Sequence, residues 1–178
     1  MMLVKQFKTL TVRLYQGDIT KSQAEAIVNA ANPQMIPGGG VDGAINRAAS
    51  LQLAPLQKSL GPIAVGEAVL TPGFNLLAKY IIHTAGPIWH GGDSREPELL
   101  AQCYQSCLAL ANHHQLTSIA FPAISTGVYH FPVQRAAVIV YDVLKSLAAQ
   151  STSVQQVDLV NFDARTAQIY EAVFNENQ

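Results

Sequence analysis

The residues best suited to binding chemistry are three consecutive glycines, Gly38, Gly39 and Gly40, which lie between an apolar segment over 26–28 and a helical pattern. Because glycine has no Cβ, its backbone can adopt positive φ and approach a ligand closely. Successive backbone N–H groups in such a loop form a concavity that binds anions, and the following helix adds the positive end of its dipole. This order of strand, glycine loop and helix predicts a phosphate group as the ligand.

Three polar side chains, Asn29, Asn32 and Asp42, flank the glycines. Such side chains bind hydroxyls, and the combination therefore favours a phosphorylated sugar over bare phosphate. Structural alternatives remain open for all three. Asp42 is also a favoured type of helix N-cap, and Asn32 is also a common turn residue. We interpret Asn29 as structural, tying the loop together.

A second polar loop over 124–129 follows the apolar segment 118–122. One interpretation is an ordinary polar loop. The interpretation we favour is a second phosphate-binding segment that uses backbone N–H groups and hydroxyls, with Tyr129 covering a ribose.

The elements that position these loops alternate between strand and helix patterns. Apolar runs predict strands over 11–15, 26–28, 67–71, 80–84, 118–122 and 157–161, and helical patterns cover 42–50, 96–114, 132–149 and 164–174. The alternation predicts an α/β fold with a mostly parallel sheet and helices on both faces. Because ligands bind outside the carboxyl ends of the strands in such sheets, both loops are expected to open onto one crevice.

The bulk composition excludes several classes of function. The 178 residues fit one domain over 1–178, and a content of 49% hydrophobic and 13% charged residues suits a packed α/β protein. A net charge of −1 without a basic run indicates no specific nucleic-acid partner. No apolar run reaches the length of a membrane span, and residues 1–10 lack the apolar core of a secretion signal. We therefore expect a cytoplasmic protein.

Two cysteines and one histidine are interpreted as core residues. Cys103 and Cys107 lie four apart on one helical face, which separates their Cβ atoms by about 5–6 Å, whereas a disulfide needs about 3.8 Å. They are expected to be buried free thiols, and without a second pair of ligands no metal site is predicted. His83 lies within a strand pattern, where a hydrogen-bonded core histidine is the commoner case.

Four motifs occur in the order typical of one family. They are Gly-Asp-Ile-Thr over 17–20, the stretch 28–49 with its Asn-Ala-Ala-Asn and glycine run, Ile-His-Thr-Ala-Gly-Pro over 82–87, and Pro-Ala-Ile-Ser-Thr-Gly-Val-Tyr over 122–129. The chain strongly resembles the macrodomain family over most of its length. It is most similar to the stand-alone bacterial deacetylases of O-acetyl-ADP-ribose and their ADP-ribosyl-hydrolase relatives. The resemblance implies a three-layer α/β/α macrodomain with a mixed, mostly parallel sheet.

The resemblance also implies roles for individual residues. Asp42 would lie by the distal ribose and orient or activate water, and Asn32 would bind the hydroxyls of that ribose. Asp18 would accept a hydrogen bond from the adenine amino group, and Phe162 would stack on adenine, although a core position for Phe162 is an alternative. The implied catalytic residues are Asp42 and Asn32, and the implied ligand-binding residues are Asp18, Ile19, Asn32, Gly38, Gly39, Gly40, Val41, Asn46, Ser125, Thr126, Gly127, Val128, Tyr129 and Phe162.

Three residues depart from the pattern of that subgroup. Asn46, one helical turn after Asp42, stands where the subgroup usually has histidine. Asparagine cannot shuttle a proton near neutral pH, whereas histidine can. Pro37 replaces the first of four glycines, and His130 replaces a glycine beside the second loop. Ligand binding is expected to survive the change at Asn46, and catalytic power is the property that this change puts in question. Pro37 removes an N–H donor and fixes φ, and His130 is expected to make the second loop less mobile.

The resemblance implies an ester hydrolase whose ligands are ADP-ribose or O-acetyl-ADP-ribose and whose partners include ADP-ribosylated proteins, with no cofactor and no metal. The alternative is a module that binds ADP-ribose without turnover, which Asn46 favours and Asp42 opposes. A serine esterase built on Ser125 fits poorly, because the helix that its nucleophile elbow requires begins only near Pro132. The glycine spacing fits neither a dehydrogenase nor a nucleoside triphosphatase.

Overall fold

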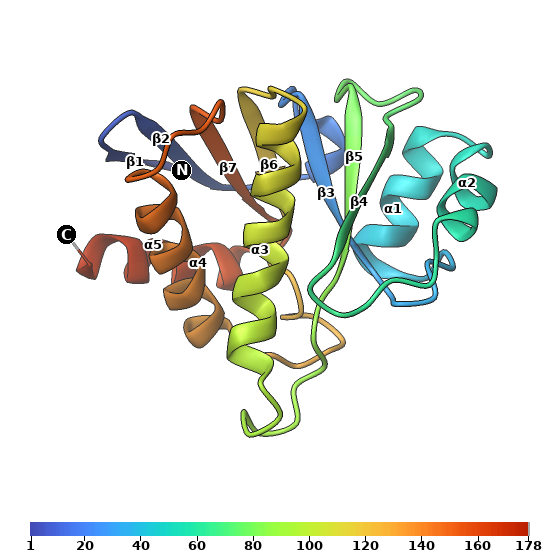
Figure 1. Ribbon diagram of the computed structural model, residues 1–178. Coiled ribbons are helices and arrows are strands. Elements are labelled where there is room, and N and C mark those ends of the chain that lie inside the picture. The colour runs from blue at the N-terminus through green and yellow to red at the C-terminus, as the bar shows by residue number, and fades with distance from the viewer. Residues whose placement is uncertain (178) are drawn as a thin grey trace.

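The computed structural model describes residues 1–177, which form one seven-stranded sheet and five α-helices (Figure 1). The strands are β1 (Met2–Phe7), β2 (Leu10–Gln16), β3 (Ala26–Ala31), β4 (Ala68–Pro72), β5 (Tyr80–Ala85), β6 (Ser118–Phe121) and β7 (Gln156–Asn161). The helices are α1 (Gly40–Ala49), α2 (Leu53–Ser59), α3 (Glu96–His113), α4 (Val133–Leu147) and α5 (Ala164–Glu176), with a short 3-10 turn, η1 (Ile19–Lys21).

The sheet has the strand order β1-β2-β7-β6-β3-β5-β4. The strands from β2 to β5 in this order pair in parallel, and the edge strands β1 and β4 pair antiparallel with β2 and β5. The prediction of a mixed, mostly parallel sheet is therefore confirmed. Because the five inner strands are parallel, the loops that follow them leave from one edge. Figure 1 shows the loops after β3, β5 and β6 together on the lower side of the view.

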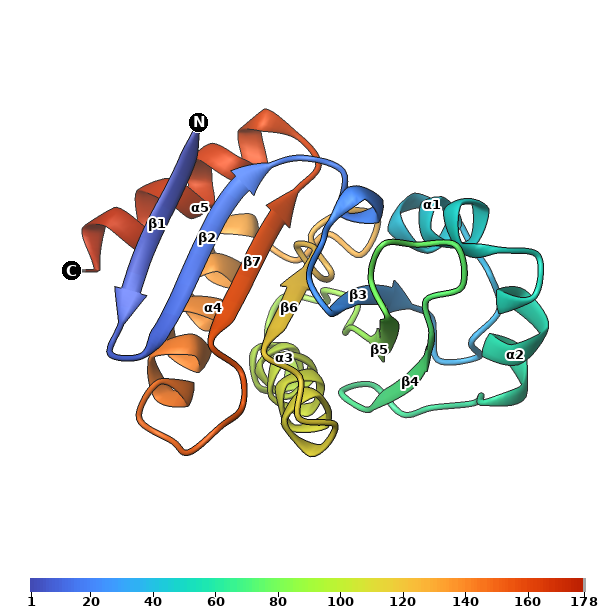
Figure 2. The same cartoon turned by 90° about the horizontal axis from the view of Figure 1, so that it is seen from above.

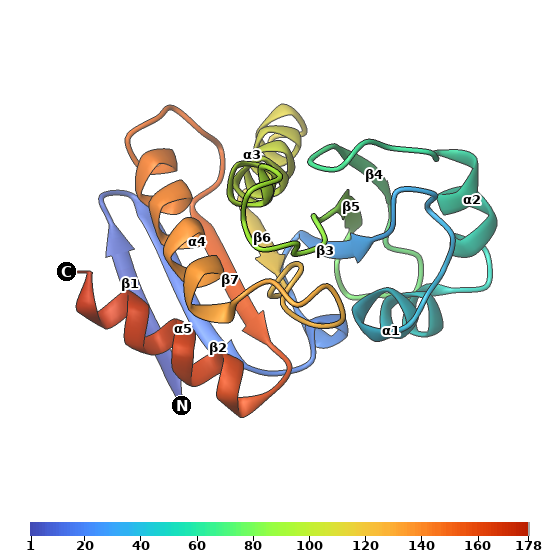
Figure 3. The ribbon, with the colours of Figure 1, turned by 90° about the horizontal axis from the view of Figure 1, so that it is seen from below.

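Helices cover both faces of the sheet, as predicted. Alternation along β3 sends Ala26 and Val28 into a large core shared with α3, α4 and α5, and sends Ile27 into a second core shared with α1 and α2. Figures 2 and 3 show the two sides, with α3, α4 and α5 on one and α1 with α2 on the other. This is the three-layer α/β/α arrangement expected from the sequence.

The second helical layer is incomplete, because no described helix covers the α1 side of β1 and β2 (Figure 2). Met2 and Val4 of β1 are 52% and 53% exposed on this side. The same side of β2 and β7 carries an ion pair: Arg13 Nη2 lies 2.6 Å from the Oδ2 atom of Asp158, whose side chain is 1% exposed. Residues 1–177 include no helix that is long and apolar enough to cross a membrane.

The predicted strands and helices are all present, with ends shifted by at most three residues. Two shifts correct the expected site. β3 continues to Ala31, so that Asn29 lies in the strand rather than in the loop, and α1 begins at Gly40, so that Asp42 lies inside the helix.

Neither β1 nor α2 is predicted from the sequence. β1 has only one buried residue, Phe7, and exists by pairing with β2 over its whole length. α2 has only seven residues and contains Pro55, so its helical pattern is too short to detect.

Candidate functional site

The glycine loop joins β3 to α1 and leaves several N–H groups free. α1 begins at Gly40, whose φ of 56° is a left-handed conformation that glycine tolerates best. Within residues 1–177 the N–H groups of Gly39, Gly40 and Val41 have no acceptor in hydrogen-bond range, and the first bond of the helical type runs from Gly43 N to Gly39 O at 3.2 Å. The three glycines are exposed. These donors, together with the positive end of α1, suit an anionic ligand.

The loop after β6 presents a second row of free donors. Its ends are held together because Phe131 N donates to Ser125 O at 2.9 Å. Over the described part of the chain, the N–H groups of Gly127, Val128 and Tyr129 have no acceptor. Gly127 and Val128 are exposed, and so this loop also offers successive backbone N–H groups to an anion.

The hydroxyls of Thr126 and Ser125 differ in their contacts, and their predicted use toward phosphate stays a prediction. The Thr126 hydroxyl donates to Ala123 O at 2.8 Å. The Ser125 hydroxyl is buried, and a Cβ added at Gly86 would clash with it and lie 2.7 Å from Ile124 Cγ2. The loops after β5 and β6 therefore pack closely, and the Ser125 hydroxyl has no partner in residues 1–177.

Asp42 is the most heavily hydrogen-bonded side chain of the site and is only 4% exposed. Its Oδ1 accepts from Asn29 Nδ2 at 2.6 Å and from Gln57 Nε2 at 3.0 Å, and its Oδ2 accepts from Gly38 N at 2.6 Å. The N-cap of α1 is Gly39, and the alternative interpretation of Asp42 as an N-cap is therefore wrong. Asp42 instead fixes the first glycine of the loop, while Asn29 holds Asp42, in line with its predicted structural role.

Asn32 lies on the same side of the glycine loop as Asp42. Its amide exchanges two hydrogen bonds with the backbone of Ile36, from Nδ2 to the carbonyl oxygen at 2.7 Å and from the N–H to Oδ1 at 3.2 Å. A Cβ added at Gly38 would lie 3.8 Å from Asp42 Oδ2 and 3.9 Å from Asn32 Nδ2. The two predicted catalytic side chains therefore converge on Gly38.

Asn46 faces Asp42, as the helical spacing predicts. Its Nδ2 lies 3.0 Å from the Asp42 carbonyl oxygen and 3.1 Å from Gln57 Oε1. Gln57 is fully buried and contacts both residues, yet sequence reasoning missed it. The only local signal was a glutamine in a short helix that was itself not predicted.

The prediction that His83 is a hydrogen-bonded core histidine is confirmed. Its ring also contacts Asn29, which holds Asp42. It is 0% exposed, with Nδ1 3.0 Å from Asn29 Nδ2 and Nε2 2.9 Å from Thr71 Oγ1. Burial lowers the pKa of His83 from 6.5 to about 4, and the negative charge of Asp42 opposes this shift only in part. The imidazole is therefore neutral near pH 7.

The turn after β2 positions Asp18 at the far end of the site. Its Oδ1 accepts from the Thr20 N–H at 2.9 Å and from the Thr20 hydroxyl at 2.7 Å, capping η1. Asp18 is exposed, and no described residue bonds its Oδ2, which leaves this oxygen for a ligand. The side chain of Ile19 packs in the core beside α1, leaving its backbone for any contact with a ligand.

Phe162 directly follows β7 and is 81% exposed. The alternative interpretation of Phe162 as a core residue is therefore wrong. Gln16 Nε2 donates to Phe162 O at 3.4 Å, and Gly17 N donates to Asn161 O at 2.9 Å. Since these bonds join the ends of β2 and β7, they bring the segments that carry Asp18 and Phe162 together.

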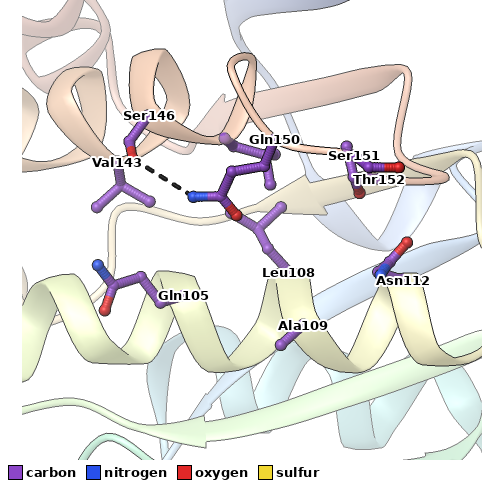
Figure 4. Close-up of a pocket in the computed structure, with 10 residues that line it drawn as sticks. Gln105, Leu108, Ala109, Asn112, Val143, Ser146, Gln150, Ser151 and Thr152 are labelled. Carbon is purple, nitrogen blue, oxygen red and sulfur yellow. Dashed lines mark hydrogen bonds between the residues drawn. The ribbon is translucent and has the colours of Figure 1, made fainter.

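A groove between α3 and α4 lies away from these loops (Figure 4). No charged side chain is among its lining residues, which are Gln105, Leu108, Ala109, Asn112, Val143, Ser146, Leu147, Gln150, Ser151 and Thr152.

In the described part of the chain, no group of three or more His, Cys, Asp or Glu residues is placed to hold a metal ion. Cys103 and Cys107 are free and buried, as expected.

Comparison with known proteins places this geometry in context. The family model described as Macro domain matches residues 28–140. A protein of Pantoea vagans named O-acetyl-ADP-ribose deacetylase 1 is 46% identical over 170 residues, which are 92% of this chain and 98% of that protein. A solved macrodomain of Oceanobacillus iheyensis with ADP has a TM-score of 0.95 at 36% identity and covers 99% of this chain and 96% of its own. A Trypanosoma brucei macrodomain in complex with ADP-ribose has a TM-score of 0.84 at 36% identity, covering 90% of this chain and 68% of its own.

Proposed function

This chain belongs to the macro domain family, and we propose that it is an enzyme that hydrolyses an ester at the distal ribose of ADP-ribose. Its substrates would be O-acetyl-ADP-ribose or proteins that carry ADP-ribose on acidic side chains. The relatives named O-acetyl-ADP-ribose deacetylase support the reaction, and the relative solved with ADP-ribose supports the ligand.

The observation that carries the proposal is the order of the site along the sheet. The strand order β2-β7-β6-β3 puts Asp18, Phe162, the loop over 125–129 and the glycine loop in sequence along one edge. ADP-ribose has the matching order of adenine, diphosphate and distal ribose. We place adenine against Asp18 and Phe162, the diphosphate between the two rows of free N–H groups, and the distal ribose beside Asn32 and Asp42.

In the proposed reaction, a water oxygen attacks the carbonyl carbon of the ester, and the bond from that carbon to the ribose oxygen breaks. The products are a carboxylic acid and a free ribose hydroxyl. Each carboxylate oxygen has about two acceptor positions. Asp42 Oδ1 accepts from Asn29 and Gln57, with Asn46 Nδ2 a further contact at 3.3 Å. Among the described residues only Gly38 N donates to Oδ2, which keeps one position for water. Asn32 would orient the ribose hydroxyls.

A second candidate is a module that binds ADP-ribose without significant turnover. Asn46 favours it, because its amide lies 3.3 Å from Asp42 Oδ1 in a place where a histidine would exchange protons and an amide does not. The free acceptor position on Asp42, which we assign to water, favours the enzyme.

We also propose a cytoplasmic location, which suits the two free, buried thiols.

The placement of adenine and diphosphate predicts tight binding of ADP-ribose and much weaker binding of ribose 5-phosphate. We expect a Kd for ADP-ribose on the order of micromolar, about −8 kcal/mol, measured by titration calorimetry. Ribose 5-phosphate lacks adenine and one phosphate, and its Kd should be at least about tenfold higher, because at least one charge-assisted contact is lost. Equal affinity for the two ligands would contradict the adenine position.

A further inference from the structure

Asp42 is the last member of a series of hydrogen-bonded, buried polar side chains that begins on the edge strand β4. The chain runs from Thr71 on β4 through His83 on β5 and Asn29 on β3 to Asp42 on α1. We propose that His83 is a positioning residue of the hydrolase: its unprotonated Nδ1 accepts from Asn29 and thereby orients the amide that holds Asp42. The inference rests on the proposed function for its kinetic consequences only.

The proton positions follow from the contacts. Asn29 Nδ2 carries two hydrogens, and one of them goes to Asp42 Oδ1 at 2.6 Å. The other hydrogen points at His83 Nδ1 at 3.0 Å, which must therefore be the acceptor. The Nε2 atom then carries the imidazole proton and donates to Thr71 Oγ1 at 2.9 Å. The flipped amide is excluded, because it would bring the Asn29 oxygen against a carboxylate oxygen.

The orientation of the Asn29 side-chain amide depends on His83. Its Oδ1 is buried without a partner in residues 1–177. The orientation of the amide is therefore fixed by its two N–H groups alone, one on Asp42 and one on His83. If His83 Nδ1 could not accept, Asn29 would carry a buried, unsatisfied donor and would rotate, and Asp42 Oδ1 would lose its shortest hydrogen bond.

The surroundings keep the imidazole in the required state. His83 is fully buried, and the side chains bonded to it from β3 and β4, Asn29 and Thr71, do not titrate. Asp42 on α1 is the charged group that acts on His83, and burial outweighs its effect and lowers the pKa to about 4. Nδ1 is therefore available as an acceptor throughout the neutral range.

Two substitutions at position 83 separate positioning from packing. In His83→Asn, the amide oxygen can occupy the place of Nδ1 and still accept from Asn29. In His83→Gln, the amide reaches the place of Nε2 and leaves Asn29 without its acceptor. We expect His83→Asn to keep kcat within about threefold and His83→Gln to lower kcat by about 10–100-fold, with the Kd for ADP-ribose changed by less than about threefold. Equal losses in both variants, or the reverse order, would overturn the proposal.

Nuclear magnetic resonance gives a readout that needs no substrate. In the wild-type protein at pH 7, the ¹⁵N shifts of His83 should show Nδ1 unprotonated and Nε2 protonated. The amide resonance of Gly38, which reports the bond to Asp42 Oδ2, should be unchanged in His83→Asn and displaced in His83→Gln. A proton on Nδ1 would refute the proposal even if His83→Gln does not fold. If the wild-type protein has no turnover, the proposed function fails, while these resonances still decide the role of His83.

Discussion

Replacing Asp42 with alanine is expected to lower kcat on O-acetyl-ADP-ribose by about 10²–10⁴-fold, the usual contribution of a positioned general acid or base. The reason is the free acceptor position on Oδ2, which we assign to the attacking water. Affinity for ADP-ribose should fall by much less. Asp42 acts on the ligand-facing residues only indirectly, through the bond from Gly38 N at 2.6 Å and the contact with Asn46 Nδ2 at 3.3 Å. Single-turnover rates beside titration calorimetry separate the two effects.

Two matched variants test the assignment. Asp18→Ala removes the carboxylate at the opposite end of the site, and it should weaken binding while leaving the single-turnover rate at saturation unchanged. Asn32→Ala should damage both rate and affinity, because bonds to ribose hydroxyls act in the ground state and the transition state alike. Normal hydrolysis by Asp42→Ala would reduce Asp42 to a structural residue of α1 and remove the proposed mechanism.

The stability of the protein is expected to fall by about 3 kcal/mol as the pH is lowered from 6.5 to about 4, because of His83 alone. Above pH 6.5 the imidazole is neutral in both the folded and the unfolded chain, and its contribution is constant. Between these values the unfolded chain binds a proton that the folded chain rejects, so stability decreases. Below about pH 4 both states bind the proton, and the decrease from this group ends.

Denaturant unfolding at a series of pH values measures this effect. Other groups also titrate. Hydrogen bonds lower the pKa values of the Glu25 and Asp163 carboxylates, and the protein therefore also loses their contribution to its stability as the pH falls. Because His83→Asn keeps those carboxylates and removes the imidazole, the difference between wild type and variant isolates His83. An identical slope in both proteins between pH 6.5 and 4 would show that His83 is protonated in the folded state.

The parts of the site that the sequence predicts are those with short-range signals. Three adjacent glycines after an apolar run and before a helical pattern indicate a strand, loop and helix from neighbouring residues alone. The spacing of four between Asp42 and Asn46 likewise places them on one helical face, as the structure confirms. The alternation of apolar strand runs and helical patterns along the chain is also a local signal. It predicts the mostly parallel sheet and the helices on both of its faces.

The parts that the sequence does not reveal depend on contacts between distant segments. Gln57 reaches Asp42 only because α2 folds back on α1, and His83 reaches Asn29 only because β3 pairs with β5. Neither contact leaves a periodic pattern in the chain. In the loop after β6, the Ser125 hydroxyl is buried against Gly86, which no local pattern indicates. That orientation is set by the close approach of two loops.

In the proposed function, this chain releases free ADP-ribose from its ligand rather than only binding it. The direct measurement is the formation of ADP-ribose and acetate from O-acetyl-ADP-ribose in excess over protein, followed by chromatography, with Asp42→Ala as the matched control. We predict many turnovers by the wild-type protein, a rate far above that without protein, and a much lower rate with Asp42→Ala. If ADP-ribose is released only at the rate seen without protein, while the protein binds ADP-ribose in the same buffer, the proposed hydrolysis is wrong and this chain is a binding module.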